Sequence, residues 1–173
     1  MDNQQERLIW LAGLIDGEGY LGINKTRRDN RFSGYQMTPR LIIVNTNQDV
    51  LQVVTQTLDE YGLAYYVGWR KPGVYKARYW KWALEVSGVK RLSRFLPVVL
   101  PNLVCKKPQA ELLLAYCQDR LSRTTERFNN KGLAKYSEQD LQVWEAIKAL
   151  NQNPQRTYAE PHKGRYVPST SEI

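Results

Sequence analysis

The sequence predicts an α+β domain in which one antiparallel sheet is backed by helices. Three observations lead to this fold class. Apolar residues recur at helical spacing in five segments, and four other segments carry the alternating or continuous apolar pattern of strands. The order of these segments is helix, two strands, helix, two strands and then helices. At 173 residues with 42% hydrophobic residues, the chain can bury the core of a single domain.

The first helix is predicted over residues 5–17, because leucine and isoleucine recur there every three or four residues. Gly17 and Gly19 are expected to end it. Two strands follow over residues 20–29 and 35–46, separated by residues that favour turns.

A second helix is predicted over residues 48–61, with Gly62 as its C-terminal stop. Two aromatic-rich strands come next, over residues 64–71 and 75–87, joined by a Lys-Pro-Gly turn.

The remaining helices are predicted over residues 88–100, over residues 107–121, and after Ser137, which can cap the last one. We expect one domain over residues 1–151, followed by a polar, proline-containing tail over residues 152–173. The sequence shows no second copy of any segment.

Charge and rare residues narrow the possible functions. Lys and Arg total 25 against 17 Asp and Glu, and the net charge of +8 favours a polyanionic partner such as nucleic acid. The single histidine and two cysteines exclude a disulfide framework, a cysteine zinc cluster and a Ser-His-Asp triad. No apolar run approaches the ~20 residues that cross a bilayer, and the polar start of the chain suits no secretory signal. Any chemistry must therefore depend on carboxylates, lysines and a hard metal ion.

The strand segments are rich in large polar and basic side chains. In the first strand, alternation places Tyr20, Asn24 and Thr26 on the face opposite Leu21 and Ile23. Arg, Asn and Gln can read base edges, and Lys and Arg can neutralise phosphates. A solvated sheet face, or an RNA platform on which Tyr and Trp stack bases, is the alternative interpretation.

Residues 11–19 read Leu-Ala-Gly-Leu-Ile-Asp-Gly-Glu-Gly. Gly13 and Gly17 lie four apart on one helix face, where two such helices can approach closely. A pair of these helices would bring together carboxylates from the end of each helix, where Asp16 and Glu18 lie. Such a site suits Mg²⁺, which proteins hold with one or two carboxylates plus water and phosphate oxygens. The alternative is a buried apolar helix whose acids only cap a loop.

This window closely resembles the signature of the LAGLIDADG homing endonucleases, with Gly17 and Glu18 as tolerated variants. The resemblance covers about residues 5–151 and implies the family's αββαββα core with a saddle-shaped sheet. Because the chain holds one motif, it resembles the homodimeric branch, and the resemblance implies Leu11, Gly13 and Gly17 at the dimer interface.

The resemblance also implies roles for individual residues. Glu18 matches the catalytic metal ligand, Gly17 the position whose carbonyl completes the metal site, and Asp16 the preceding structural acid. Lys106, preferred over Lys107, matches a basic residue near the scissile phosphate.

A polar residue at the end of the second strand positions the attacking water in the family. Asn45, Thr46 and Asn47 are the candidates, and Thr46 and Asn47 are expected among the catalytic residues. The alternation cannot choose between the three, because every position from 41 to 44 is apolar.

Residues expected to contact DNA lie along the strands and near the hairpin tips. They are Tyr20, Asn24, Thr26, Arg28, Arg31, Arg40, Arg70, Lys76 and Arg78.

The resemblance thus implies a homodimeric, Mg²⁺-dependent endonuclease that cleaves both strands of a long, pseudo-palindromic double-stranded DNA target, with Mn²⁺ or Ca²⁺ able to replace Mg²⁺ in binding. Two alternatives stay open: an intron-encoded maturase that binds intron RNA, and a catalytically inactive DNA-binding protein on the same scaffold. The expected location is a chloroplast, a mitochondrion or a prokaryotic cytoplasm, with no membrane partner and no secretion.

Overall fold

The fold comes from a computed structural model, which describes residues 4–29, 33–71, 79–123 and 135–152. Within these ranges the predicted order of elements is confirmed. The elements are α1 (Gln4–Glu18), β1 (Gly19–Arg27), β2 (Tyr35–Asn45), α2 (Gln48–Glu60), β3 (Tyr66–Arg70), β4 (Lys81–Ser87), α3 (Val89–Val99), the short 3₁₀ helix η2 (Leu100–Asn102), α4 (Lys107–Ser122) and α5 (Glu138–Gln152).

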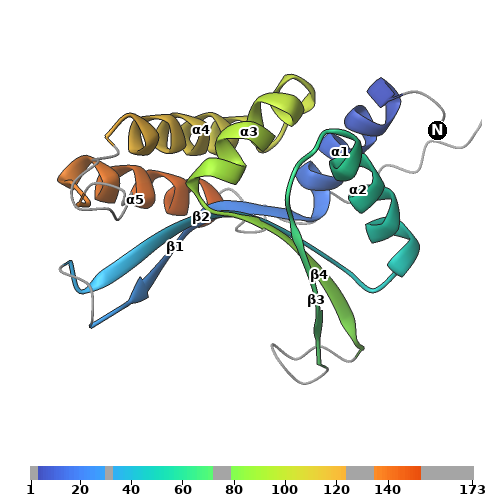
Figure 1. Ribbon diagram of the computed structural model, residues 1–173, viewed down its shortest axis with the longest axis horizontal. Coiled ribbons are helices and arrows are strands. Elements are labelled where there is room, and N and C mark those ends of the chain that lie inside the picture. Colours follow the sequence, from blue (N-terminus) through green and yellow to red (C-terminus); the bar gives the residue numbers. More distant parts are fainter. Residues whose placement is uncertain (1–3, 30–32, 72–78, 124–134, 153–173) are drawn as a thin grey trace, which may run out of the picture.

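The four strands form one antiparallel sheet in the order β1-β2-β4-β3. All five α-helices lie on one side of this sheet, and the sheet arches so that its other side is concave (Figure 1). The β1–β2 hairpin and the β3–β4 pair form the two arms of the arch. The predicted α+β class with a saddle-shaped sheet is therefore confirmed.

The core fills the space between the helices and the convex side of the sheet. It includes Leu11 and Ile15 of α1, Leu41 of β2, Leu84 of β4 and Phe95 of α3, all at most 1% exposed. Burying these large apolar side chains is the main stabilisation of the domain, at about 1.5–3 kcal/mol for each one.

The junction of α1 and β1 differs from the prediction. Gly17 does not end the helix, which continues through Glu18. The chain enters β1 at Gly19, where a Cβ atom would lie 2.7 Å from the carbonyl oxygen of Ile15. Only glycine therefore allows the strand to leave the helix so closely, and this turn fixes the place of Glu18.

The end of α2 agrees with the prediction, since Gly62 follows the helix with a φ of 60°. Other boundaries differ from the prediction by a few residues. The strand predicted over residues 75–87 is described as a strand only from Lys81, and residues 72–78, including most of the Lys-Pro-Gly turn, lie outside the described residues. The predicted tail after Gln152 also lies outside the described residues. None of the helices in the described ranges combines the length and the apolar character that crossing a membrane requires.

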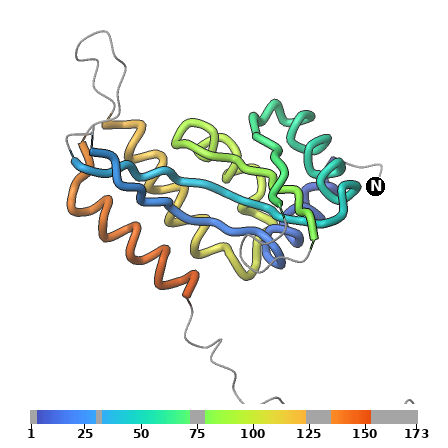
Figure 2. The backbone as a smooth tube through the Cα atoms, turned by 90° about the horizontal axis from the view of Figure 1, so that it is seen from below, coloured from blue at the N-terminus to red at the C-terminus, as the bar shows by residue number. Residues whose placement is uncertain are grey.

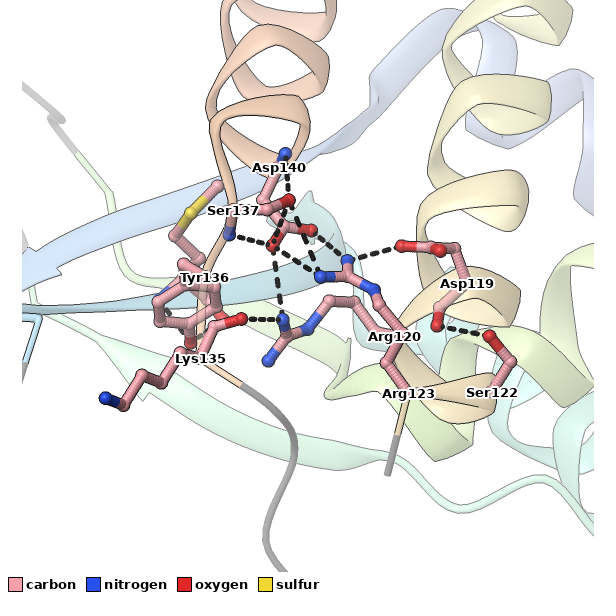
Figure 3. A network of polar contacts seen from close by, with 9 residues as sticks. Asp119, Arg120, Ser122, Arg123, Lys135, Tyr136, Ser137 and Asp140 are labelled. Carbon is pink, nitrogen blue, oxygen red and sulfur yellow. Dashed lines mark hydrogen bonds and ion pairs between the residues drawn. The ribbon is translucent and has the colours of Figure 1, made fainter. Parts of the chain in front are cut away.

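A buried carboxylate joins α4 to α5 (Figure 3). Asp140 is 1% exposed and accepts from Arg120 at 3.2 Å, from Arg123 at 2.7 Å and from the backbone N–H of Ser137 at 2.7 Å. Burial by itself raises the pKa of Asp140, but the hydrogen bonds from Arg123 and Ser137 and the charges of both arginines outweigh it, so the pKa lies below its ordinary value. The Ser137 hydroxyl accepts from the N–H of Asp140 at 3.3 Å, which confirms the predicted helix cap.

Tyr136 connects this cluster to the sheet (Figure 3). Its hydroxyl accepts from the Met37 N–H at 2.9 Å and donates to the Met37 carbonyl at 3.1 Å. The Arg120 guanidinium lies 4.7 Å from the centre of its ring. The helices α4 and α5 are therefore tied to β2 as well as to each other.

The helix α5 runs alongside β1, the edge strand of the sheet (Figure 2). Near its end, the Asn151 amide donates to the carbonyl oxygen of Leu21 at 2.8 Å. This bond holds the last turn of α5 beside the junction of α1 and β1.

Candidate active site

Glu18, the last residue of α1, presents an exposed carboxylate at the junction of α1 and β1. One of its oxygens accepts a hydrogen bond from the side-chain amide of Asn45 at 2.7 Å. The contact follows from the sheet register: Gly19 pairs with Ile43, so β2 extends two residues beyond the start of β1 and reaches the helix end.

Asp16 has a structural role, as predicted for the preceding acid. Its two carboxylate oxygens accept from the backbone N–H groups of Val104 and Lys106, each at 2.8 Å. The Lys106 ammonium in turn donates to the Asp16 carbonyl oxygen. Asp16 thereby attaches the start of α4 to the end of α1, which brings Lys106 next to the motif.

A cleft of about 440 Å³ lies where these segments meet. It brings together Glu18, Lys106, Tyr20 and Gln109, from α1, the start of α4 and β1. Gln109 is 8% exposed, and its carbonyl oxygen has no hydrogen-bond partner among the described residues. The sequence analysis did not include Gln109, since no pattern around it indicates that it lines a cleft.

The three candidate residues at the end of β2 have different surroundings. Asn47 caps α2, since its side-chain oxygen accepts from the N–H of Asp49 at 2.8 Å, and Thr46 is exposed. Asn45 contacts Glu18, and its own side-chain oxygen accepts from the N–H of Asn47 at 2.8 Å. The structure therefore brings only Asn45 of the three into hydrogen-bonding contact with the predicted metal ligand.

The ligands available for a metal ion are few within one chain. No group of three or more His, Cys, Asp or Glu side chains that could hold a metal occurs among the described residues. The Glu18 carboxylate and the carbonyl oxygen of Gly17, which also lines the cleft, are hard oxygen donors of the kind that Mg²⁺ binds together with water and phosphate oxygens. The oxygen donors of Glu18 and Gly17 therefore fit a magnesium ion, although the described residues of one chain supply only part of a full set of ligands.

Comparison with known proteins identifies the fold. No protein-family model matches the chain, and no curated protein sequence matches it either. Solved structures do match. The homing endonuclease I-CvuI in complex with the I-CreI target aligns over 89% of this chain and 87% of its own at 21% identity, with a TM-score of 0.64. The group I intron-encoded homing endonuclease I-CeuI aligns over 82% of this chain and 66% of its own at 16% identity, with a TM-score of 0.60. The archaeal intron-encoded I-Vdi141I aligns over 87% of this chain and 99% of its own at 15% identity, with a TM-score of 0.57.

The chain has the LAGLIDADG homing endonuclease fold. At these identities the likeness concerns the fold, and it confirms the resemblance stated from residues 11–19 at that level. The LAGLIDADG helix is α1, and its last residue is the cleft carboxylate Glu18.

One face of the LAGLIDADG helix is open to solvent. Cβ atoms built at Gly13 and Gly17 would meet no atom within 4 Å, and Ile9, one turn before Gly13, is 54% exposed. Val104, bonded to the end of this helix through Asp16, is 78% exposed. Leu11, expected with the two glycines at an interface, is 1% exposed and packs in the protomer's own core, so the open face presents Ile9 in its place.

The concave face of the LAGLIDADG sheet carries the residues that alternation predicts for it. Tyr20, Asn24 and Thr26 lie opposite the buried Leu21 and Ile23, and the Asn24 amide donates to the Thr26 hydroxyl at 3.0 Å.

The other expected contact residues are placed as follows. The sheet register puts Arg40 and Arg70 on the concave face as well. Arg28 is exposed just after β1. Arg31, Lys76 and Arg78 lie outside the described residues.

Proposed function

We propose that this protein is a divalent-metal-dependent homing endonuclease that acts as a homodimer and cleaves both strands of a pseudo-palindromic DNA duplex. The observation that carries the proposal is the position of Glu18. This carboxylate ends the LAGLIDADG helix, is exposed in a cleft, and has Asn45 and Lys106 beside it. The concave face of the sheet, on which the register puts Arg40 and Arg70, adjoins the cleft through Tyr20, and cationic groups of this kind suit an enzyme that acts on duplex DNA.

The proposed chemistry is hydrolysis of a phosphodiester. Glu18 and the Gly17 carbonyl would hold a Mg²⁺ ion, which when bound makes an attacking hydroxide available at neutral pH and neutralises charge on the phosphate oxygens. The Lys106 ammonium is placed to stabilise negative charge that develops on the phosphate in the transition state.

Asn45 is the residue that we assign to positioning. Its amide group has a fixed orientation, because its oxygen accepts from the Asn47 N–H while its nitrogen donates to Glu18. It therefore holds the Glu18 carboxylate in one orientation, as outer partners of metal ligands do. Asn47 serves as the cap of α2, and Thr46 has no comparable contact with Glu18. We therefore assign the positioning role to Asn45 in place of Thr46 and Asn47.

The homodimer is supported by the open face of α1. Its two glycines are not required by packing within the protomer, since added Cβ atoms would meet nothing, and the apolar Ile9 and Val104 beside them are exposed. The chain also corresponds to only 43% of the meganuclease I-SmaMI, which was solved bound to DNA, but to 87% of I-CvuI. Two copies related by a two-fold axis would place two Glu18 carboxylates together and read a symmetric target.

Replacing Gly13 with leucine tests the dimer. We expect Gly13→Leu to give a folded monomer, because the side chain meets open space in the protomer but would separate two α1 helices. Sedimentation velocity measures the mass and circular dichroism the helix content. Gln52→Leu adds the same side chain to the exposed surface of α2 and should leave the mass of the dimer unchanged. A wild-type chain that sediments as a monomer with and without DNA would contradict the proposal.

Cleavage selection on a randomised duplex library, with Mg²⁺ and with EDTA in parallel, tests the activity. We expect recovery of a near-palindromic site of about 20 base pairs, since each half-site occupies about one helical turn, with cutting only in the presence of the metal. Retention of a specific site without cutting would indicate the catalytically inactive DNA-binding protein. Failure to enrich any duplex, together with binding to intron RNA, would indicate the maturase.

A further inference from the structure

Tyr20 lies flat along β1 over a glycine. A Cβ atom at Gly22 would be 2.4 Å from the phenolic oxygen of Tyr20 and 2.6 Å from its Cζ atom. No other residue at position 22 leaves room for the ring in this position, and Gly22 is buried although Tyr20 itself is 40% exposed. The Tyr20 ring therefore forms part of the concave surface, with one side toward solvent.

Arg40 lies beside this ring. In the β1–β2 register it pairs with Gly22, and its Cζ atom is 5.9 Å from the centre of the Tyr20 ring, within the range of a cation–π contact. Its Nε atom is buried and has no hydrogen-bond partner among the described residues. The ring thus lies beside the guanidinium at cation–π distance and occupies none of its hydrogen-bond donors.

The position of Tyr20 and Arg40 along the concave face determines which base pairs of the DNA target they can contact. Tyr20 is two residues from Glu18 and lines the same cleft. Arg40 is opposite the next residue of β1 on that face, Gly22. Of the two arginines that the register places on the concave face, Arg40 contacts Tyr20, which lines the cleft, whereas Arg70 is the last residue of β3.

Resting on the proposed function, we propose that Arg40, held by Tyr20 over Gly22, recognises a guanine at the innermost base pair that the sheet reads in each half-site. A planar guanidinium for which no hydrogen bond occurs among the described residues matches the O6 and N7 acceptors that guanine shows in the major groove. A ring in contact with the guanidinium restricts the rotamers of Arg40 before DNA arrives, which lowers the entropic cost of the contact. Tyr20 acts through Arg40 and is therefore a positioning residue.

The β3 strand offers a matched control. Tyr66 lies over Gly68 in the same way, since a Cβ atom at Gly68 would be 2.8 Å from Cε1 of Tyr66. The register places Tyr66 on the same face and in the same row as Tyr20, at the opposite edge of the sheet. Gly68→Ala therefore imposes the same steric change away from Arg40.

The experiment measures binding to the recovered wild-type target after randomisation of its innermost sheet-read positions, with Ca²⁺ in place of Mg²⁺. We expect the wild-type chain to prefer guanine at one of these positions by between about 5-fold and about 100-fold, the range for one bidentate contact. Arg40→Ala should remove this preference and leave the preferences at other positions intact. Gly22→Ala should reduce it several-fold while Gly68→Ala leaves it unchanged, and Tyr20→Phe, which keeps the ring, should retain it.

The alternatives are distinguishable. If Arg40→Ala weakens binding equally for all four bases and lowers the salt dependence, Arg40 contacts a phosphate and the inference is wrong. A preference that persists unchanged in Arg40→Ala also overturns it. A wild-type chain that binds no duplex would overturn the proposed function and this inference together. Circular dichroism of each variant checks that the fold is intact, which Gly22→Ala should preserve because the atom it displaces is the end of a side chain.

Discussion

Two carboxylates at helix ends show how differently this fold uses the same chemical group. Asp140, in the first turn of α5, is buried and accepts from two arginines and a backbone N–H. Glu18, the last residue of α1, is exposed in a cleft and accepts from the Asn45 amide. The helix dipole favours a negative charge at the start of α5 and disfavours one at the end of α1.

The difference separates stability from function. The hydrogen bonds and charges around Asp140 stabilise its ionised form within the protein, so nothing more is needed to hold it. The Glu18 carboxylate lies at the helix end where the dipole disfavours a negative charge, and it is exposed to solvent. A bound cation would therefore stabilise its charge. We therefore expect substitutions at the two sites to have opposite effects on stability and cleavage.

The largest expected effect is the loss of cleavage in Glu18→Gln. Removing the charge should reduce the rate by about 1,000-fold or more, since charge stabilisation at the reacting phosphate is lost. The free energy of unfolding should stay constant or rise by about 0.3–1 kcal/mol, because a charge disfavoured by the helix dipole is removed. Single-turnover cleavage and chemical denaturation measure the two quantities. A variant that cuts at the wild-type rate would show that Glu18 is not the metal ligand.

Asp140→Asn should lower the free energy of unfolding and leave the rate of cleavage unchanged. It leaves Arg120, which is 1% exposed, without its buried charge partner, and breaking such a pair costs about 3–5 kcal/mol. Denaturant titration should show this loss, while the folded fraction cleaves DNA at the wild-type rate. Glu145→Gln, on the exposed surface of the same helix, is the control and should change stability little.

Two neighbouring asparagines sharpen the comparison on a smaller scale. Asn45→Ala should slow cleavage by about 10–100-fold, the usual cost of losing an outer partner of a metal ligand. Asn47→Ala should leave cleavage by the folded protein unchanged but lower the free energy of unfolding by about 1 kcal/mol, because α2 loses its cap. If Asn47→Ala slowed cleavage and Asn45→Ala did not, the assignment of the positioning residue would be wrong.

The last prediction concerns the pH dependence of stability due to Asp140, which changes nothing at neutral pH and appears only in acid. Because its pKa in the folded protein lies below the value of about 4 of the unfolded chain, the stabilisation is complete above about pH 4 and is lost as the pH falls through the folded pKa. Thermal unfolding of the wild type and of Asp140→Asn as a function of pH should therefore show two curves that converge in acid. Parallel curves would mean that Asp140 does not contribute in this way.

The sequence allowed most of this fold to be predicted, for physical reasons. Helices such as α4 follow from apolar spacing, and the Ser137 cap follows from a serine three residues before an acid. The nine-residue signature located Glu18 without any knowledge of its surroundings.

What could not be predicted depends on contacts between distant segments. The choice of Asn45 depends on the register of β1 and β2, because Ile42 and Val44 are apolar on the concave face and hide the alternation. The partnership of Arg120 with Asp140 joins residues that are twenty positions apart in the sequence. A Tyr-x-Gly pattern occurs in both β1 and β3. It could have indicated that each tyrosine ring lies over a glycine, but only the structure shows this contact.

The bond from Asn151 to the carbonyl of Leu21 affects how open the edge of the sheet is to other polypeptide chains. The strand β1 is an edge strand, and an open edge of that length is a template onto which another polypeptide can add. The helix α5 runs along this edge, and Asn151 occupies one of its carbonyl groups. The opposite edge, β3, is only five residues long. The helix α5 thus covers part of the β1 edge, and we expect a chain shortened before α5 to be prone to self-association by strand addition.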